Sequence, residues 1–231
     1  MNITEQLKKE AILSQENAEK HPVEARYNRN ISEYEHYLGI SMNKTLRRLN
    51  SRQNHPLVVL DVMCGGGKAV QELNRDYGID AFGVDMMNYP EHGNSEYCDR
   101  FIISPAENLS MIPNASVDLL VSVIGIAEYS SSLYTSMSEA LRVLRPGGEL
   151  HATPFMSKGE LNDKRHQNLC HHEGYRAIED YEKRTGQKLK YESTRKILPL
   201  RNLVRSGISC IRNGTPMITQ MFSALHLEKR G

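Results

Sequence analysis

The sequence of 231 residues contains no tryptophan, four phenylalanines and four cysteines. Four cysteines in a chain of this length do not make a disulfide scaffold. No segment approaches the ~18–20 consecutive apolar residues that a membrane-spanning helix requires. The first twenty residues, MNITEQLKKEAILSQENAEK, lack the apolar segment of a cleavable secretory signal. The composition therefore predicts a cytoplasmic protein without a membrane partner.

Charge of neither sign dominates the chain, but its distribution is uneven. The 29 basic and 28 acidic residues leave a formal net charge of +1. Residues 158–231 carry 15 Lys and Arg against 8 Asp and Glu, which is an excess of seven positive charges. This excess is compatible with a solvated basic surface and with attraction for an anionic partner. Few aromatic residues accompany the basic ones, so a nucleic-acid partner is not expected.

Short apolar runs alternate with helical segments along the chain. The run Leu57–Leu60 is continuously apolar, as is typical of a strand buried on both faces. Strands that alternate with helices indicate a parallel, doubly wound sheet. The predicted strands are 57–60, 81–84, 100–104, 117–123, 149–153, about 188–198 and about 217–227. Helices are predicted over 4–20, at the end of 24–49, and over 68–77, 130–144 and about 165–185, with a turn at 146–148.

The turn after the first predicted strand separates three classes of nucleotide site. Its glycines, 65–67, would let the backbone approach a ligand closely at the start of a helix. A phosphate-binding loop would need Ser or Thr where Ala69 stands. A dinucleotide fingerprint would need a third glycine at Val70. The third class places an acidic residue at the strand end, here Asp61, and binds a nucleoside with a positive sulfonium and an amino-acid tail.

The segment VVLDVMCGGGKAV (58–70) resembles the first motif of the class I S-adenosylmethionine-dependent methyltransferases. Three further segments resemble motifs of that family and follow in its order: Val84-Asp85, residues 104–123 and residues 139–150. The resemblance covers about residues 57–154. It implies a Rossmann-like methyltransferase fold and S-adenosyl-L-methionine as the cofactor.

The predicted fold is an α/β fold with a doubly wound, mostly parallel, seven-stranded sheet and an N-terminal helical extension. Residues 1–50 are expected to form a helical lid or extension, and residues 51–231 a methyltransferase-like domain. The chain departs from the family pattern at Met63, where the family usually has a glycine. It also departs at Ser104 and Pro105, where the family often has an aspartate that accepts a hydrogen bond from the adenine.

The resemblance also implies roles for individual residues. Asp85 would bind the ribose diol, Met86 would pack on the adenine, and Asp61 would neutralise the cofactor's amino group. The full set of predicted cofactor-binding residues is Asp61, Met63, Cys64, Gly65, Gly67, Asp85, Met86, Ala106, Glu107, Val123 and Tyr27. Structural alternatives stay open, namely a helix cap for Asp85, a plain turn for the glycines and core packing for Met86. Tyr27, Tyr34 and Tyr37 could form an aromatic lid over the sulfonium or simply pack in an interface.

Methyl transfer from a sulfonium is an in-line displacement with a neutral leaving group. The protein therefore mainly aligns the reactants and excludes water. A base is needed only if the acceptor must lose a proton. The catalytic candidates are Glu128, Tyr129 and His151, and a surface or packing role is the alternative for each. His171 and His172 are weaker candidates of the same kind.

A small molecule is the expected methyl acceptor, with a protein side chain as the second choice. The Asn/Asp-Pro-Pro-aromatic sequence of amino-methylating DNA enzymes is absent after the fourth predicted strand. His166 and Cys170 share a helix face, but no second ligand cluster accompanies them, so no metal is predicted. Two alternatives remain: a non-catalytic interaction protein that keeps the fold, and another small-molecule enzyme on this scaffold, such as an aminopropyl transferase. The pattern does not indicate an oligomeric state.

Overall fold

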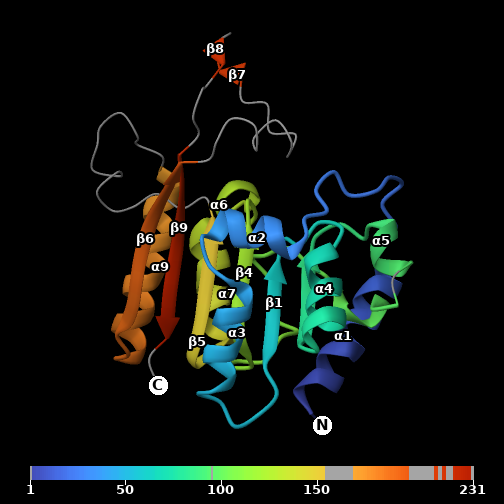
Figure 1. The fold of residues 1–231 in the computed structure, drawn as a ribbon, viewed down its shortest axis with the longest axis horizontal. Coiled ribbons are helices and arrows are strands. Elements are labelled where there is room, and N and C mark those ends of the chain that lie inside the picture. The colour runs from blue at the N-terminus through green and yellow to red at the C-terminus, as the bar shows by residue number, and fades with distance from the viewer. Residues whose placement is uncertain are drawn as a thin grey trace.

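The computed structural model describes residues 2–94, 96–153, 169–197, 211–212, 215–216 and 221–229. Within them a seven-stranded sheet runs in the order β3-β2-β1-β4-β5-β9-β6 (Figure 1). Neighbouring strands pair in parallel from β3 to β5, and β9 is antiparallel to both of its neighbours. The strands are β1 (Val58–Val62), β2 (Asp80–Asp85), β3 (Phe101–Ile103), β4 (Val117–Val123), β5 (Leu144–Thr153), β6 (Leu189–Ile197) and β9 (Met221–Lys229), with β7 (Ile211–Arg212) and β8 (Thr215–Pro216) forming a separate ribbon. The predicted doubly wound, mostly parallel fold is confirmed.

Helices cover both faces of the sheet (Figure 1). One apolar cluster joins α2, α3 and α4 to one face, and a second joins α1, α7 and α9 to the other. All five residues of β1 are buried as a result, which explains its continuous apolar run. In the described part of the chain, no helix is long and apolar enough to cross a membrane. The helices are α1 (Ile3–Asn17), α2 (Ile31–Leu38), α3 (Met42–Asn50), α4 (Lys68–Tyr77), α5 (Pro90–Gly93), α6 (Ile126–Tyr129), α7 (Leu133–Val143) and α9 (Leu169–Thr185), with a 3-10 turn at Cys98–Arg100.

The predicted boundaries agree best in the middle of the chain. α4 and β4 have the predicted bounds, and Gly78 ends α4 in the left-handed conformation, as predicted. The predicted helix 130–144 begins later, because the Ser132 hydroxyl accepts a hydrogen bond from the Thr135 N–H and caps α7 there. The predicted turn at 146–148 lies inside β5, whose pairing with β4 shifts register at this point. The first part of the predicted helix 165–185 lies outside the described residues.

Helix α1 lies along the edge strand β3 and satisfies its outward backbone groups. The Ser14 Oγ accepts a hydrogen bond from the Ile103 N–H at 2.9 Å, and the Gln15 Nε2 donates to the Phe101 carbonyl at 2.7 Å. Leu7 and Ala11 of the same helix are fully buried. The side chains of α1 thus provide the hydrogen bonds that a further strand would provide at this edge.

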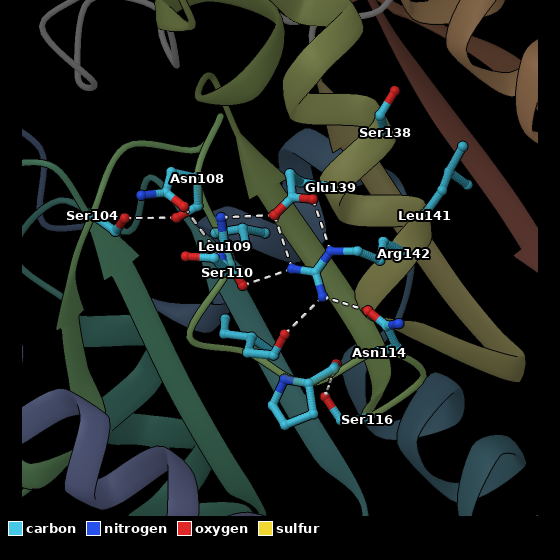
Figure 2. A network of polar contacts seen from close by, with 12 residues as sticks. Ser104, Asn108, Leu109, Ser110, Asn114, Ser116, Ser138, Glu139, Leu141 and Arg142 are labelled. Carbon is cyan, nitrogen blue, oxygen red and sulfur yellow. Dashed lines mark hydrogen bonds and ion pairs between the residues drawn. The ribbon is translucent and has the colours of Figure 1, made fainter.

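Arg142 and Glu139 of α7 bond to the long loop between β3 and β4 (Figure 2), where Glu139 accepts a hydrogen bond from the Leu109 N–H at 2.9 Å. The Arg142 guanidinium donates to the carbonyls of Leu109 at 2.7 Å and Ile112 at 2.9 Å, and to Asn114 Oδ1 at 2.7 Å. It also forms a two-pronged ion pair with Glu139. Five hydrogen bonds in fixed directions are a pattern that guanidinium provides and ammonium does not.

We expect Arg142→Lys to lower the free energy of unfolding by about 1–3 kcal/mol, because loop carbonyls lose their donors while the charge is kept. Chemical denaturation followed by circular dichroism measures the change. Arg75→Lys is the matched control, because Arg75 pairs with Asp76 at the exposed surface of α4. Equal midpoints for Arg142→Lys and the control would show that the loop does not depend on the guanidinium.

Candidate functional site

The turn between β1 and α4 is held by the chain segment that precedes α2. The Gly66 N–H donates to the Tyr27 carbonyl at 3.1 Å, and the Lys68 N–H donates to Asn28 Oδ1 at 2.9 Å. These are N–H groups at the start of a helix, which have no partner within it. Residues 27–28 therefore lie directly against the glycine-rich turn.

The same turn is held from the side of β2 and α5. The Gly65 N–H donates to Asp85 Oδ2 at 2.9 Å, and His92 Nε2 lies 2.7 Å from the Gly65 carbonyl. Burial lowers the pKa of His92, so its ring is neutral near pH 7. The carbonyl can only accept, so Nε2 carries the ring proton. The His92 ring also stacks on Phe101, with 4.4 Å between ring centroids.

The glycines of the turn make room for the protein's own atoms. Gly65 and Gly67 both have positive φ angles, of 56° and 74°. A Cβ on Gly65 would collide with the Tyr27 carbonyl, and one on Gly67 would collide with the Phe101 ring. Met63 also has a positive φ, of 63°. This is the left-handed conformation that glycine adopts most easily, so the backbone at Met63 fits the glycine of the family pattern.

A cavity of about 410 Å³ lies beside the turn, at the carboxyl ends of β1 and β2. β1 is flanked by β2 on one side and by β4 on the other, which is the point where the strand order reverses. Ligands of open α/β sheets bind at such a point. The residues that line the cavity are Arg26, Tyr27, Arg29, Met63, Gly65, Asp85, Met86, Met87, Tyr89, Ile124 and Tyr129.

Asp85 ends β2 at the wall of this cavity. Its Oδ1 accepts a hydrogen bond from the Met87 N–H at 3.1 Å, in addition to the bond from Gly65 to Oδ2. Burial raises the pKa of Asp85, and the backbone N–H groups of Met87, Gly65 and Met86 act in the opposite direction. Each carboxylate oxygen has a second lone pair, so the group can still accept from a ligand. The next side chain, Met86, lines the cavity with 58% of its surface exposed.

Asp61 is a buried carboxylate near the end of β1. Its Oδ2 accepts a hydrogen bond from the Tyr34 hydroxyl at 2.6 Å, whereas Oδ1 has no hydrogen-bond partner among the described residues. Burial raises the pKa of Asp61 to about 7; the Tyr34 hydrogen bond opposes this rise, the charge of Asp85 adds to it and the charge of Arg29 opposes it.

Arg29 supplies a positive charge to the same region. Its guanidinium carbon lies 4.5 Å from the ring centroid of Tyr27 and 5.5 Å from that of Tyr37. Its Nη2 is buried and has no hydrogen-bond partner among the described residues. Buried polar groups are normally satisfied by protein, water or a ligand. An unsatisfied cationic nitrogen and an unsatisfied carboxylate oxygen are complementary to a ligand that carries both charges.

The structure places five of the predicted cofactor-binding residues in the cavity wall: Tyr27, Met63, Gly65, Asp85 and Met86. The others do not line it. Cys64, Ala106 and Val123 are buried, as is Asp61, and Gly67 faces Phe101.

The side chains of the β3–β4 loop bond within the protein. Glu107 accepts hydrogen bonds from the N–H groups of Ser131 and Ser132, just before α7. The Ser104 hydroxyl donates to the Asn108 carbonyl at 2.6 Å. These bonds fix the segment 104–108, and neither side chain lines the cavity.

The catalytic candidates are separated by the fold. Tyr129 lines the cavity and is hydrogen-bonded to Tyr27. Glu128 is exposed on α6 and does not line it. His151 lines a different cavity, of about 370 Å³, where it contacts Glu149 at 3.1 Å and His226 at 2.6 Å.

The other candidates lie away from the cavity. Tyr34 and Tyr37 are buried and do not line it, so Tyr27 is the member of the predicted aromatic lid that does. The side chains of His166, Cys170 and His171 lie outside the described part, and His172 is exposed. Among the described residues no group of three or more metal-ligating side chains is found.

Several residues of the site were not anticipated from the sequence. Arg29 and Tyr89 line the cavity, as do Arg26 and Met87, and His92 and Asn28 hold the turn. Met87 directly follows a predicted residue at a strand end, so the family position could have indicated it. Residues 26–29 belong to no periodic segment. Their net positive charge and the aromatic residue Tyr27 were the only signals that the sequence offered there.

Comparisons with known proteins agree with this geometry. Residues 60–152 match the family model of the methyltransferase domain. Three of the solved structures that share the fold each match most of this chain. The YcgJ protein from Bacillus subtilis has a TM-score of 0.54 and 14% identity, over 83% of this chain and 100% of that one. An S-adenosylmethionine-dependent methyltransferase from Methanosarcina mazei has a TM-score of 0.50 and 17% identity, over 79% and 97%. The [4+2]-cyclase SpnF has a TM-score of 0.50 and 14% identity, over 97% and 93%. No curated protein is significantly similar in sequence.

We expect Asp61→Asn to stabilise the ligand-free protein at neutral and alkaline pH. The folded pKa of Asp61, about 7, lies above its ordinary value of 3.8, so folding is favoured by protonation. The stability that protonated Asp61 contributes to folding is fully present below about pH 4 and is lost as the pH rises through 7. Asparagine keeps an acceptor for Tyr34 without a charge, and the gain reaches at most about 4 kcal/mol.

Thermal unfolding from pH 4 to pH 8.5 measures this effect. The melting temperature of Asp61→Asn should rise relative to the native protein between pH 4 and 7 and then keep a constant difference. Asp76→Asn, an exposed position on α4, is the control. A difference that does not change with pH would contradict a titration of Asp61.

Proposed function

Because residues 60–152 match the family model of the methyltransferase domain, we propose that the protein is a class I S-adenosylmethionine-dependent methyltransferase and that it transfers a methyl group from S-adenosyl-L-methionine to a small-molecule acceptor. The observation that carries the proposal is the cavity at the reversal of the strand order. Asp85, at the end of β2, and Arg29, whose Nη2 has no partner among the described residues, both line this cavity. Their charges act on Asp61, which is buried and whose Oδ1 has no partner among the described residues.

The residues present fit the three parts of this cofactor. Asp85 has free lone pairs for the two ribose hydroxyls, and the exposed side chain of Met86 offers an apolar surface for the adenine. The methionine tail is a zwitterion, with one carboxylate and one ammonium group. Arg29 would bind the carboxylate and Asp61 the ammonium, and this pairing would satisfy both buried groups.

When bound, S-adenosylmethionine supplies a methyl group on a positively charged sulfur. The chain contributes orientation and the exclusion of water. Tyr27 and Tyr129 border the cavity beyond the end of β4 and join the segment before α2 to α6. We propose that this pair forms one wall of the acceptor site.

Tyr129 keeps its proton at neutral pH. Burial raises its pKa above the ordinary value, and the neighbouring Tyr27 adds to the rise. A neutral hydroxyl can donate a hydrogen bond to the acceptor but is a poor base. We therefore propose catalysis by alignment, without a base among the residues that line the cavity. The guanidinium of Arg26, at the cavity wall, would favour an acceptor with negative charge.

The fold alone does not determine the reaction, since the [4+2]-cyclase SpnF shares it. Binding and transfer must therefore be measured separately. Transfer of a labelled methyl group from S-adenosylmethionine to the small-molecule fraction of a cell extract tests the second step. Label in the protein fraction alone would point to a protein acceptor. Tight cofactor binding with no transfer to either fraction would favour the non-catalytic alternative.

We expect Asp85→Ala to weaken the binding of S-adenosylmethionine by about 1–3 kcal/mol, the cost of an unpaired polar contact. Isothermal titration calorimetry with S-adenosylmethionine and S-adenosylhomocysteine measures the loss. Asp76→Ala removes an exposed carboxylate from α4 and should bind like the native protein. No binding at millimolar ligand, by folded native protein shown to be free of co-purified cofactor, would contradict the proposed function.

A further inference from the structure

The Tyr34 hydroxyl does not line the cavity, but contacts of helix α2 with the rest of the protein hold it in place. The capping box of Asn30 and Glu33 fixes the first turn of α2, with both hydrogen bonds at 2.9 Å. The Ile31 N–H donates to Glu72 of α4 at 2.7 Å. Tyr34 itself is 3% exposed, so its ring has one position in the packed interior. The direction of its O–H group is therefore determined by the fold.

This hydroxyl donates a hydrogen bond to one of the two carboxylate oxygens of Asp61. The bond of 2.6 Å to Oδ2 has the length of a hydrogen bond between a hydroxyl and a carboxylate. It fixes the plane of the carboxyl group, and Oδ1 keeps its lone pairs. An asparagine would accept the same hydrogen bond without the cost of a buried charge. A carboxylate at this position is thus unexplained by packing.

The ionisation of Asp61 depends on a balance among its neighbours. The titratable and charged groups that face it are Tyr34 of α2, Arg29 before α2, Asp85 of β2 and Cys64 of the turn. Burial and Asp85 oppose its negative charge, while Tyr34 and Arg29 favour it. Arg29 would be engaged by the carboxylate of a bound ligand. Tyr34 is then the neighbour that still favours the ionised form of Asp61 when a ligand is bound.

We propose that Tyr34 is a positioning residue that orients Asp61 toward the ammonium group of the cofactor and sets the pH range in which this carboxylate binds it. The inference rests on the proposed function. It goes further in assigning the pH dependence of cofactor binding to one hydrogen bond between α2 and β1.

Two ligands separate this role from a general effect on the fold. S-adenosylhomocysteine carries the ammonium group, and 5′-methylthioadenosine has the same adenosine and sulfur without the amino-acid tail. Calorimetry with both, from pH 6 to 8.5, is made on the native protein, Tyr34→Phe and Asp61→Asn. Tyr181→Phe is the control, because it removes another buried tyrosine hydroxyl, which donates to Gln187 next to α9.

For the native protein, the affinity for S-adenosylhomocysteine should fall as the pH falls through about 7, where Asp61 becomes protonated. Tyr34→Phe should weaken this ligand roughly 5- to 20-fold at pH 7 and move the midpoint to higher pH. Asp61→Asn should weaken it with little dependence on pH. All variants should bind 5′-methylthioadenosine like the native protein, which also shows that they are folded.

An equal loss for both ligands, or a Tyr34→Phe midpoint equal to that of the native protein, would overturn the role of Tyr34 and leave the proposed function intact. Native protein that binds neither ligand at any pH would overturn the proposed function itself. If Tyr34→Phe does not fold, Asp61→Asn still decides: a pH-dependent profile equal to the native one would contradict the proposal.

Discussion

The attachment of residues 27–28 to the glycine-rich turn is the contact on which the site depends. A carbonyl and an amide oxygen from this segment take the N–H groups of Gly66 and Lys68. The Tyr27 carbonyl can approach the turn this closely because Gly65 has no side chain. The same attachment places Arg29 and Tyr27 at the cavity and leads directly into α2, which carries Tyr34. Two hydrogen bonds therefore join the turn to the segment that carries these three side chains.

Much of the fold could be predicted because its signals are local. A strand buried on both faces must be apolar throughout, and β1 is. The end of α4 is marked by Gly78, whose positive φ is readily adopted by glycine. The order of four motifs then indicated the sheet. The turn expected at 146–148 was wrong because Pro146 and both glycines join a strand that is irregular opposite β4.

Tyr27 was predicted as part of an aromatic lid, and the other cavity-wall residues that could be predicted lie at or after strand ends. Asp85 and Met86 were found in this way. Glu107 and His151 come from equally suitable positions, but their side chains bond to Ser131 and His226, which are far away in the sequence. Those partners cannot be identified without the tertiary structure. Arg29 was missed for a different reason: it lies before α2, in a segment with no periodic pattern, and its contacts with Tyr27 and Tyr37 depend on how that segment folds back.

Helix α1 has a further consequence for the behaviour of the chain. An open sheet has two edges, and an uncovered edge strand can pair with a strand of another molecule. At β3 the backbone groups of Phe101 and Ile103 are already bonded to side chains of α1. Helix α1 thus occupies the edge at which a strand of another molecule would pair, independently of any part that it has in binding. At the opposite edge β6 carries Lys190 and Glu192, and charged side chains on an edge strand disfavour the same pairing.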